Sequence, residues 1–350
     1  MKSKAAIQTG YNERLIVDEL EIPDPQPHQV IVKLYSSGIC HSQLHQMHDP
    51  ELSRPFVPGH EATGVVTHVG RDVDHVKESD HAIVTWVSRT PLTGRPTRAP
   101  SGATYHEEIV NGVLVYTWAE DALVDAQYVV PISKEHPTDV SSIVGCAVLT
   151  GAGAVLNTAR VRPGDSVAVI GVGGVGLSAV RMAAILEANP IIVVDLRDDK
   201  LEFAKEFGAT HGVNASKSDA VKEIVEISGG GVDYAFDAIG VRASTEQILP
   251  ATRGGGPGAD NHGGMAVLIG LPGKEMTLDP RLFLFHQRRF RGSLGATYPE
   301  KDFPMFLRWH QEGKFPLDKL VTRRYKLEQI NEACDALEAG EILGRSIIEF

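Results

Sequence analysis

Two cysteines and one histidine, widely separated along the chain, are residues whose types could do chemistry together. They are Cys40 in SGICHSQLH, His60 in VPGHEATG and Cys146 in GCAVLTG. Two thiolates and an imidazole form a Cys2His set, which leaves one position open on a tetrahedral zinc ion. Spacing alone does not decide the matter, because ligands from separate loops have no fixed interval. Cys146 also suits a small buried core position, and His60 is one of fourteen histidines.

The second candidate site is the glycine-rich run GVGGVG. It follows the apolar strand SVAVI and opens the helical stretch VGLSAVRMAAILEA, which is the context of a dinucleotide-binding turn. Glycines here permit a tight turn, close approach of the backbone to a pyrophosphate, and close contact between helix and strand. The helix N-terminus offers free N–H groups to the phosphates. The residues expected to contact the coenzyme are Gly171, Gly173, Gly174, Val175 and Gly176.

An acidic residue follows the next expected strand. Strand 191–194 leads into Asp195, nineteen residues beyond Gly176. A carboxylate there accepts hydrogen bonds from the adenosine ribose and repels a 2′-phosphate, so the sequence favours NAD over NADP. Arg197 is a counter-argument, because a nearby cation can hold that phosphate. The alternative is a parallel α/β domain without a ligand, which leaves the coincidence of strand, turn, helix and acid unexplained.

Two regions of different periodicity must position these residues. The first 150 residues contain short β-branched runs between Gly, Pro and Asp, which predicts a β-rich domain. Beyond them, strands alternate with helices, which predicts βαβ crossovers and a doubly wound parallel sheet. The expected strands are 30–34, 64–69, 82–87, 127–131, 166–170, 191–195, 232–237, 265–270 and 346–350. The expected helices are 151–160, 198–207, 217–228, 242–251, 300–312 and 327–339.

Composition limits the partners and the compartment. Acidic residues outnumber basic ones by 45 to 34, so the formal charge is −11, which disfavours nucleic acid and anionic membrane surfaces. The N-terminal segment contains no apolar run of the length that a signal peptide or a membrane span requires. Three cysteines are an odd, sparse set that predicts no disulfide framework and fits a reducing, cytoplasmic location.

The motifs GICHSQLH, PGHEATGVV and GCAVLTGAGAV, followed by GVGGVG, resemble those of the zinc-containing alcohol dehydrogenases of the medium-chain dehydrogenase/reductase superfamily. The resemblance spans essentially the whole chain. It implies a GroES-like catalytic domain over residues 1–150, completed by 290–350, and a Rossmann NAD-binding domain over 151–289. It also implies reversible hydride transfer between a small alcohol and NAD, giving an aldehyde or ketone, and a homodimer or homotetramer.

The resemblance assigns roles at the metal. It makes Cys40, His60 and Cys146 the ligands of a catalytic zinc. Glu61 corresponds to an acidic residue behind the metal that can approach it during ligand exchange. Ser42 corresponds to the hydroxyl that contacts the alcohol, and His45 to the far end of a proton relay that runs through Ser42 and the nicotinamide ribose.

Further roles concern the coenzyme and the substrate. The coenzyme contacts that the resemblance implies are His41 and Arg345 at the pyrophosphate, Thr150 at the nicotinamide, Lys200 near the adenosine ribose, and Ile269. Trp86 corresponds to an aromatic wall of the substrate pocket, although ordinary core burial explains a tryptophan there equally well.

Two departures from the family pattern stand out. Segment 88–126 contains no cysteine, whereas the family often binds a structural zinc there through four, so we expect a single catalytic zinc. Packing by Tyr105, Tyr116 and Trp118 would then hold this lobe. Gln43 occupies the place of an aspartate that is bonded to the histidine ligand, and such a change alters metal affinity and activity.

Two alternatives come from the same superfamily and a third from a different class of protein. A polyol dehydrogenase of the same superfamily typically has a glutamate at the third ligand position, where this chain has Cys146. A zinc-independent enoyl or quinone reductase would lack Cys40 and Cys146. A non-catalytic, crystallin-like dinucleotide-binding protein would have no reason to keep the ligands together with Ser42 and His45.

Overall fold

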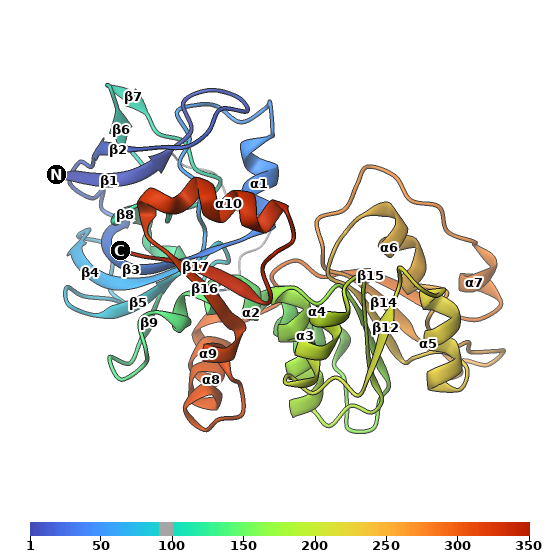
Figure 1. The fold of residues 1–350 in the computed structure, drawn as a ribbon. Coiled ribbons are helices and arrows are strands. Elements are labelled where there is room, and N and C mark those ends of the chain that lie inside the picture. Colours follow the sequence, from blue (N-terminus) through green and yellow to red (C-terminus); the bar gives the residue numbers. More distant parts are fainter. Residues whose placement is uncertain (91–100) are drawn as a thin grey trace. The chain divides into compact units, whose positions relative to one another are not determined.

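The computed structural model describes residues 1–90 and 101–350 and contains two compact units (Figure 1). Unit 1 consists of Met1–Cys146 and Tyr298–Phe350, and unit 2 of Ala147–Thr297. Unit 1 is therefore assembled from both ends of the chain. Within the described residues, no helix has both the length and the apolar character needed to cross a bilayer.

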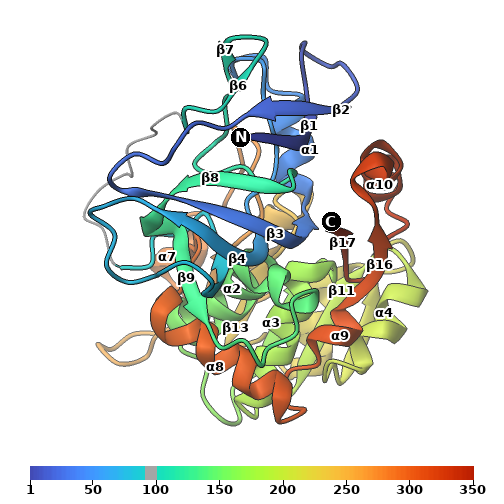
Figure 2. The same cartoon turned by 90° about the vertical axis from the view of Figure 1, so that its left-hand side faces the viewer.

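Unit 1 is built on a seven-stranded sheet in which β16-β17-β3-β4-β5-β9 follow one another and β8 also pairs with β3. The strands are β3 (Gln29–Ile39), β4 (Ala62–Val69), β5 (His81–Val84), β8 (Asp121–Asp125), β9 (Val129–Ile132), β16 (Val321–Tyr325) and β17 (Arg345–Glu349). β3 lies inside this sheet, where it pairs with β17, β4 and β8 (Figure 2). Its side chains are buried on both faces for most of its length. A smaller sheet joins β1 (Lys2–Ile7), β2 (Ile16–Glu21), β6 (Thr104–Tyr105) and β7 (Glu108–Ile109).

Short helices complete unit 1. They are α1 (His41–Met47), η1 (Ala126–Tyr128), η2 (Val140–Gly145), α8 (Pro299–Gln311), α9 (Leu317–Leu320), η4 (Leu327–Gln329) and α10 (Ile330–Glu338). The strand expected over residues 127–131 starts two residues later than expected, at Val129. The Asp125 carboxylate accepts a hydrogen bond from the backbone N–H of Gln127, which closes the 3₁₀ turn η1 and delays β9 to Val129.

The lobe without cysteines is held largely by buried aromatic residues. Trp118 is fully buried and its indole N–H donates to the carbonyl of Gly38 at 3.1 Å. The Tyr116 hydroxyl accepts from the backbone N–H of Leu123 at 3.0 Å. Tyr105 is only partly buried. Two of the three aromatic residues expected to pack this lobe are therefore buried, Tyr116 and Trp118, and they belong to two different hydrophobic clusters of unit 1.

Unit 2 contains a six-stranded parallel sheet in the order β12-β11-β10-β13-β14-β15. The strands are β10 (Val167–Ile170), β11 (Ile191–Asp195), β12 (His211–Asn214), β13 (Tyr234–Asp237), β14 (Met265–Leu268) and β15 (Arg289–Gly292). The strand order reverses between β10 and β13, and ligands of such sheets bind beyond the carboxyl ends of the strands at that point. The doubly wound sheet predicted from the sequence is therefore present.

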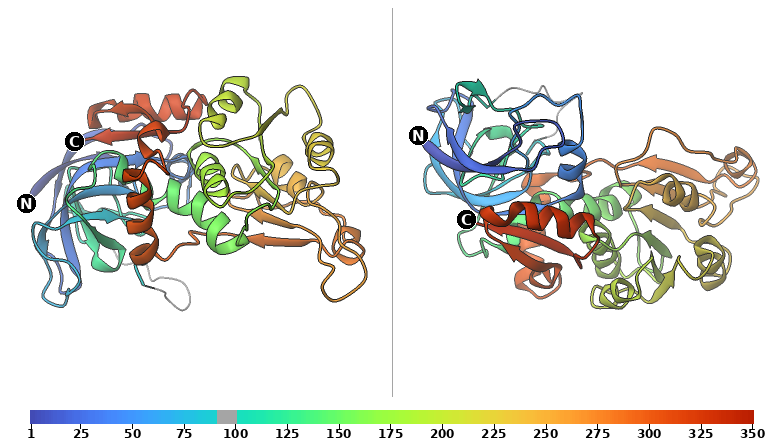
Figure 3. Two further views of the ribbon diagram at one scale, coloured as in Figure 1. Left: turned by 90° about the horizontal axis from the view of Figure 1, so that it is seen from below. Right: turned by 45° about the horizontal axis from the view of Figure 1, so that its top comes forward.

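Helices cover both faces of this sheet, with α3 and α4 on one face and α5 and α6 on the other (Figure 3). The helices are α2 (Ala147–Gly153), η3 (Ala154–Ala159), α3 (Gly174–Ile185), α4 (Asp198–Lys205), α5 (Ala220–Ser228), α6 (Arg242–Ile248) and α7 (Arg281–Leu284). The helix expected over 151–160 begins earlier, at Ala147, and its second half, η3, is π-helical. It ends at Arg160, whose φ of 59° is left-handed.

Candidate metal centre and nucleotide loop

Three separate segments of unit 1 bring Cys40, His60 and Cys146 together. Cys40 directly follows β3, His60 lies just before β4, and Cys146 follows η2. β3 and β4 are antiparallel partners, and the pairing of Ser37 with Ala62 brings the first two segments side by side. One possible ligand atom from each of the three side chains lies within 4.8 Å of the other two. All three side chains are buried.

The chemistry of this cluster fits a metal ion. The Cys146 thiol hydrogen-bonds to Cys40, and with the positive charge of Arg345 it holds the pKa of Cys40 well below its usual range despite burial. The pKa of Cys146 is raised, because its thiol shares that hydrogen bond and is buried beside negative charge. Nε2 of His60 is buried and has no hydrogen-bond partner among the described residues. The cluster thus offers sulfur and nitrogen ligands of the kind zinc prefers.

A buried ion pair stands next to the two cysteines. Arg345 donates through Nη2 to Oε1 of Glu61, and the side chains are 6% and 0% exposed. Burial alone would lower the pKa of Arg345, but the negative charges of Cys40, Glu61 and Cys146 raise it above its ordinary value. Arg345 therefore stays charged. Gly38 is needed here, because a Cβ atom would lie 2.3 Å from the Glu61 carboxylate.

Gln43 links the metal cluster to the start of α1. Its Oε1 accepts from the backbone N–H of Cys40, the N-cap residue, and its Nε2 lies 3.0 Å from Nδ1 of His60. The side chain is fully buried. Gln43 thus fixes the orientation of the imidazole and caps the helix with the same amide.

The helix α1 carries three further predicted residues. Ser42 and His45 are three residues apart, so they share one side of the helix. Ser42 Oγ is buried without a hydrogen-bond partner in the described part of the chain, whereas His41 and His45 are exposed. Trp86, just beyond β5, is partly buried, and its indole N–H likewise has no partner among the residues described.

The glycines of the nucleotide loop differ in what a side chain would meet. At Gly176 a Cβ atom would lie 1.8 Å from the carbonyl oxygen of Gly171, so only glycine permits this approach of helix and strand. Gly171 has a φ of +89°, and its Cβ would lie 2.4 Å from the Ile239 side chain. At Gly173 a Cβ would meet nothing within 4 Å. This open position precedes the first turn of α3, where backbone N–H groups can bind an anion.

Asp195 ends β11 and holds the loop in place. Its Oδ2 accepts from the backbone N–H of Val172 at 3.1 Å, and its Oδ1 from that of Leu196 at 2.8 Å. The guanidinium of Arg197 is engaged by Asp199, with Nε 2.9 Å from Oδ1. The cation that could have favoured a 2′-phosphate is therefore already paired with a carboxylate.

The remaining predicted coenzyme residues of unit 2 lie on three different elements. Thr150 is on α2, and its hydroxyl is buried without a partner among the described residues. Lys200 is a partly exposed residue of α4. Ile269 follows β14 and donates its backbone N–H to the carbonyl of Asp237 at 2.9 Å.

Two features of the site were not indicated by the sequence. Ile239 follows β13, contacts the position of Gly171 and is 44% exposed, so it borders the nucleotide loop. Its place directly after a parallel strand was the available signal. The second feature is the pairing of Glu61 with Arg345, a residue that the resemblance placed only near the pyrophosphate. No local pattern could indicate this pairing, because 284 residues separate the two side chains.

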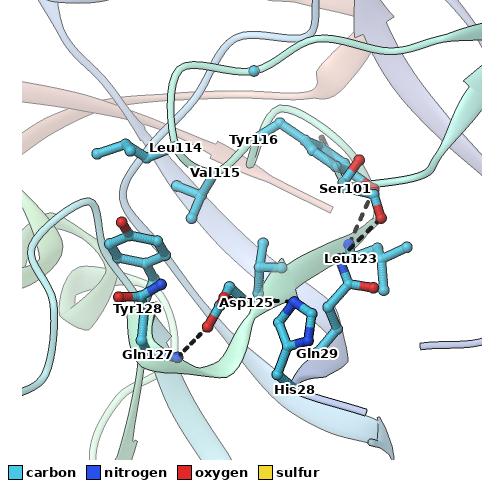
Figure 4. Close-up of a pocket in the computed structure, with 12 residues that line it drawn as sticks. His28, Gln29, Ser101, Leu114, Val115, Tyr116, Leu123, Asp125, Gln127 and Tyr128 are labelled. Atoms are coloured by element: carbon cyan, nitrogen blue, oxygen red, sulfur yellow. Dashed lines mark hydrogen bonds and ion pairs between the residues drawn. The ribbon is translucent and has the colours of Figure 1, made fainter. Parts of the chain in front are cut away.

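A separate pocket lies in unit 1, lined by residues 28–29, 101 and others between 112 and 128 (Figure 4). Its lining includes His28, Asp125 and Tyr128, and the His28 imidazole is 3.8 Å from the Asp125 carboxylate. None of the residues predicted for the metal, the coenzyme or the substrate lines it. It therefore adds nothing to the chemistry of the metal cluster.

Two family models match the chain, "Alcohol dehydrogenase GroES-like domain" over residues 26–134 and "Zinc-binding dehydrogenase" over 174–312. The S-(hydroxymethyl)glutathione dehydrogenase of Synechocystis is 33% identical over 380 residues, covering 100% of both chains. Among solved structures, an alcohol dehydrogenase zinc-binding domain protein from Burkholderia ambifaria has a TM-score of 0.90 at 30% identity. The benzyl alcohol dehydrogenase of Acinetobacter calcoaceticus has a TM-score of 0.88 at 29% identity. Both structural matches cover 100% of this chain and 99% of the other.

Proposed function

The chain belongs to the zinc-containing alcohol dehydrogenases of the medium-chain dehydrogenase/reductase superfamily, and we propose that Cys40, His60 and Cys146 hold its catalytic zinc. The observation that carries this proposal is the convergence of three buried ligand atoms to within 4.8 Å from three separate segments. The reaction is the reversible oxidation of an alcohol to an aldehyde or ketone. The polyol dehydrogenase and reductase alternatives are disfavoured by the same two cysteines.

Zinc, when bound, supplies a Lewis acid that polarises the substrate oxygen and lowers the pKa of an alcohol, and NAD supplies the hydride acceptor. The chain's own task is to move the proton. We infer that Ser42 Oγ, buried and without a partner among the described residues, accepts the hydroxyl proton of the substrate while its own hydroxyl proton leaves along the relay toward His45. His45 is exposed one turn further along α1 and passes that proton to solvent.

The ion pair of Glu61 and Arg345 supports the metal ligands electrostatically. A positive charge buried beside Cys40 and Cys146 favours their thiolate forms, which are the forms that bind metal. The Glu61 carboxylate keeps the guanidinium in place. Glu61 is also the residue we propose to approach the metal when ligands exchange.

We propose NAD as the coenzyme, bound by the loop 171–176 and by Asp195. Support comes from the open position at Gly173 and from the engagement of Arg197 by Asp199. The remaining proposed coenzyme contacts are His41, Thr150, Lys200, Ile269 and Arg345. Trp86 is proposed as a wall of the substrate pocket.

We propose one zinc ion per chain. Segment 88–126 contains no cysteine, so the thiolates of a second, structural site are missing from the lobe. Tyr116 and Trp118 of that segment are buried instead, in two hydrophobic clusters of unit 1. Free thiols at both proposed cysteine ligands also support a reducing, cytoplasmic compartment.

A homodimer or homotetramer is the proposed assembly. β15 is an edge strand of the unit 2 sheet, and large apolar side chains near it are exposed. Leu294, Leu284 and Phe285 are 78%, 74% and 64% exposed. Light scattering coupled to gel filtration measures the mass directly, and a monomeric mass at micromolar concentration would contradict the assembly.

The experiment that tests the function combines metal analysis with a substrate panel. Purified protein should contain about one zinc per chain, the number that a single Cys2His site holds. Primary, secondary, branched and aromatic alcohols are then offered with NAD, and NADH absorbance reports turnover. The relatives named for S-(hydroxymethyl)glutathione and benzyl alcohol make these two compounds the first to try. Two zinc ions per chain would contradict the single site, and no turnover with any alcohol would contradict the reaction.

A further inference from the structure

Gln43 lies between two groups that both need a hydrogen-bond acceptor once a metal is bound. Its amide contacts the backbone N–H of Cys40 on one side and Nδ1 of His60, at 3.0 Å, on the other. The side chain is 0% exposed, so solvent does not replace a missing partner. An amide has a single acceptor atom, its oxygen, whereas a carboxylate has two.

The requirement at His60 follows from the chemistry of imidazole. Nδ1 faces Gln43, so the nitrogen available to a metal is Nε2, which is buried and has no partner among the described residues. A neutral imidazole that gives its Nε2 lone pair to a metal carries its proton on Nδ1. His60 is then a donor toward Gln43.

Neither orientation of the amide satisfies both neighbours. In the orientation of the structure, the oxygen accepts from Cys40, and the NH2 group faces Nδ1 of His60, which must act as acceptor. That arrangement places the imidazole proton on Nε2, where it blocks metal binding. In the reversed orientation the oxygen accepts from His60, but the NH2 group faces the Cys40 N–H, donor against donor. The conflict therefore does not depend on how the amide is placed.

We propose that Gln43 is a positioning residue that weakens the hold of this centre on zinc. The inference rests on the proposed zinc site at Cys40, His60 and Cys146. When zinc binds, either the Cys40 N–H loses its hydrogen bond to Gln43, or the Nδ1–H of His60 faces the NH2 group of Gln43 without an acceptor. Zinc is therefore bound less tightly, and exchanges more readily, than if both N–H groups had an acceptor. Glutamate has the same length as glutamine, and its two oxygens would accept from both neighbours at once.

Zinc affinity of Gln43→Glu measures the effect. The variant and the wild-type enzyme, both loaded with zinc, are titrated with a chromophoric zinc chelator at neutral pH. We expect the dissociation constant of Gln43→Glu to be about 10- to 100-fold lower, the range in which partners of metal ligands act. Gln46→Glu is the matched control, because it adds the same charge to α1 at a partly exposed side chain and should leave the dissociation constant unchanged.

Equal or weaker zinc binding by Gln43→Glu, in a folded variant, would overturn the inference. The proposed function would stand in that case, provided that wild-type protein holds zinc and Cys146→Ala does not. If Cys146→Ala held zinc as tightly as wild type, the proposed site and the inference would both fail. The two failures are therefore distinguishable.

A second measurement needs no variant. Nitrogen-15 NMR of histidine-labelled wild-type protein reports which ring nitrogen of His60 carries the proton. We expect the proton on Nε2 in protein stripped of zinc by the chelator, and on Nδ1 after zinc is returned. A proton on Nδ1 in both forms would show that the amide already serves His60 as acceptor, which contradicts the proposal.

Discussion

The metal centre of unit 1 and the nucleotide loop of unit 2 are built in opposite ways. The metal centre consists of buried side chains from three distant segments, and its neighbouring ion pair spans 284 residues. The nucleotide loop consists of six consecutive residues whose backbone is proposed to bind the coenzyme, with glycines at the close contacts. Damage to the first should therefore remove chemistry or stability, whereas damage to the second should alter coenzyme affinity.

The largest expected effect comes from removing a metal ligand. Cys146→Ala should lower turnover by roughly 10³-fold or more, because the charge that develops on the substrate oxygen loses its stabilising centre. NAD binding, followed by fluorescence titration, should persist, since unit 2 supplies the loop. Cys334→Ala is the matched control. Burial in α10 raises the pKa of Cys334 to about 12, so its thiol stays neutral and the variant should keep zinc and turnover. Full activity of Cys146→Ala would contradict the ligand assignment.

Breaking the buried ion pair should destabilise the protein strongly. Arg345→Met removes the positive member of a buried ion pair and leaves the negative charge of Glu61 in place, which costs about 3–5 kcal/mol of unfolding free energy. The double variant Glu61→Gln/Arg345→Met should recover much of the loss, because both charges of the buried pair are then removed. Arg14→Met removes an exposed pair with Asp335 and should change nothing measurable in a urea titration. Equal stability of Arg345→Met and Arg14→Met would contradict the importance of burial.

Two glycines of the nucleotide loop should separate packing from binding. Gly176→Ala places a Cβ atom 1.8 Å from the Gly171 carbonyl oxygen, so we expect a loss of about 1–3 kcal/mol of stability together with NAD affinity. At Gly173 the added Cβ atom meets nothing within 4 Å, so the free energy of unfolding of Gly173→Ala should lie within about 0.5 kcal/mol of the wild-type value. This variant should nevertheless bind NAD more weakly. Unfolding curves and NAD titrations of both variants make the test. Unchanged NAD binding by Gly173→Ala would show that the open position does not receive the coenzyme.

The smallest expected effect is on coenzyme choice. Asp195→Gly removes the carboxylate that repels a 2′-phosphate, so the preference for NAD over NADP should fall by roughly 10- to 100-fold, the worth of a hydrogen bond to a charged group. The ratio of kcat/KM with the two coenzymes measures it. Asp199→Gly is a second variant for comparison. It removes the carboxylate that binds the Arg197 guanidinium and should therefore improve NADP binding. An unchanged preference in Asp195→Gly would show that another residue sets it.

Local patterns predicted nine of the seventeen strands that the structure describes, and the missed ones include β8, which is buried beside β3. The runs at 191–195 and 265–270 are apolar because both strands are buried in the sheet. β12 and β15 were missed, since they lie at the two edges of the unit 2 sheet and their sequences, HGVN and RFRG, contain few apolar residues. The short helix α1 was missed as well, and its start depends on a cap by Gln43 that a sequence pattern does not reveal.

Residue types and their local order were enough to indicate the nucleotide loop, because a strand, a turn and a helix that follow one another need no distant partner. They also supplied the thiols and the imidazole of the metal centre. Only the tertiary structure brought these three side chains together, paired Arg345 with Glu61, and placed the Gln43 amide between the backbone N–H of Cys40 and Nδ1 of His60. The physical reason is that desolvation and hydrogen-bond matching depend on neighbours in space, and the sheet of unit 1 joins residues from both ends of the chain.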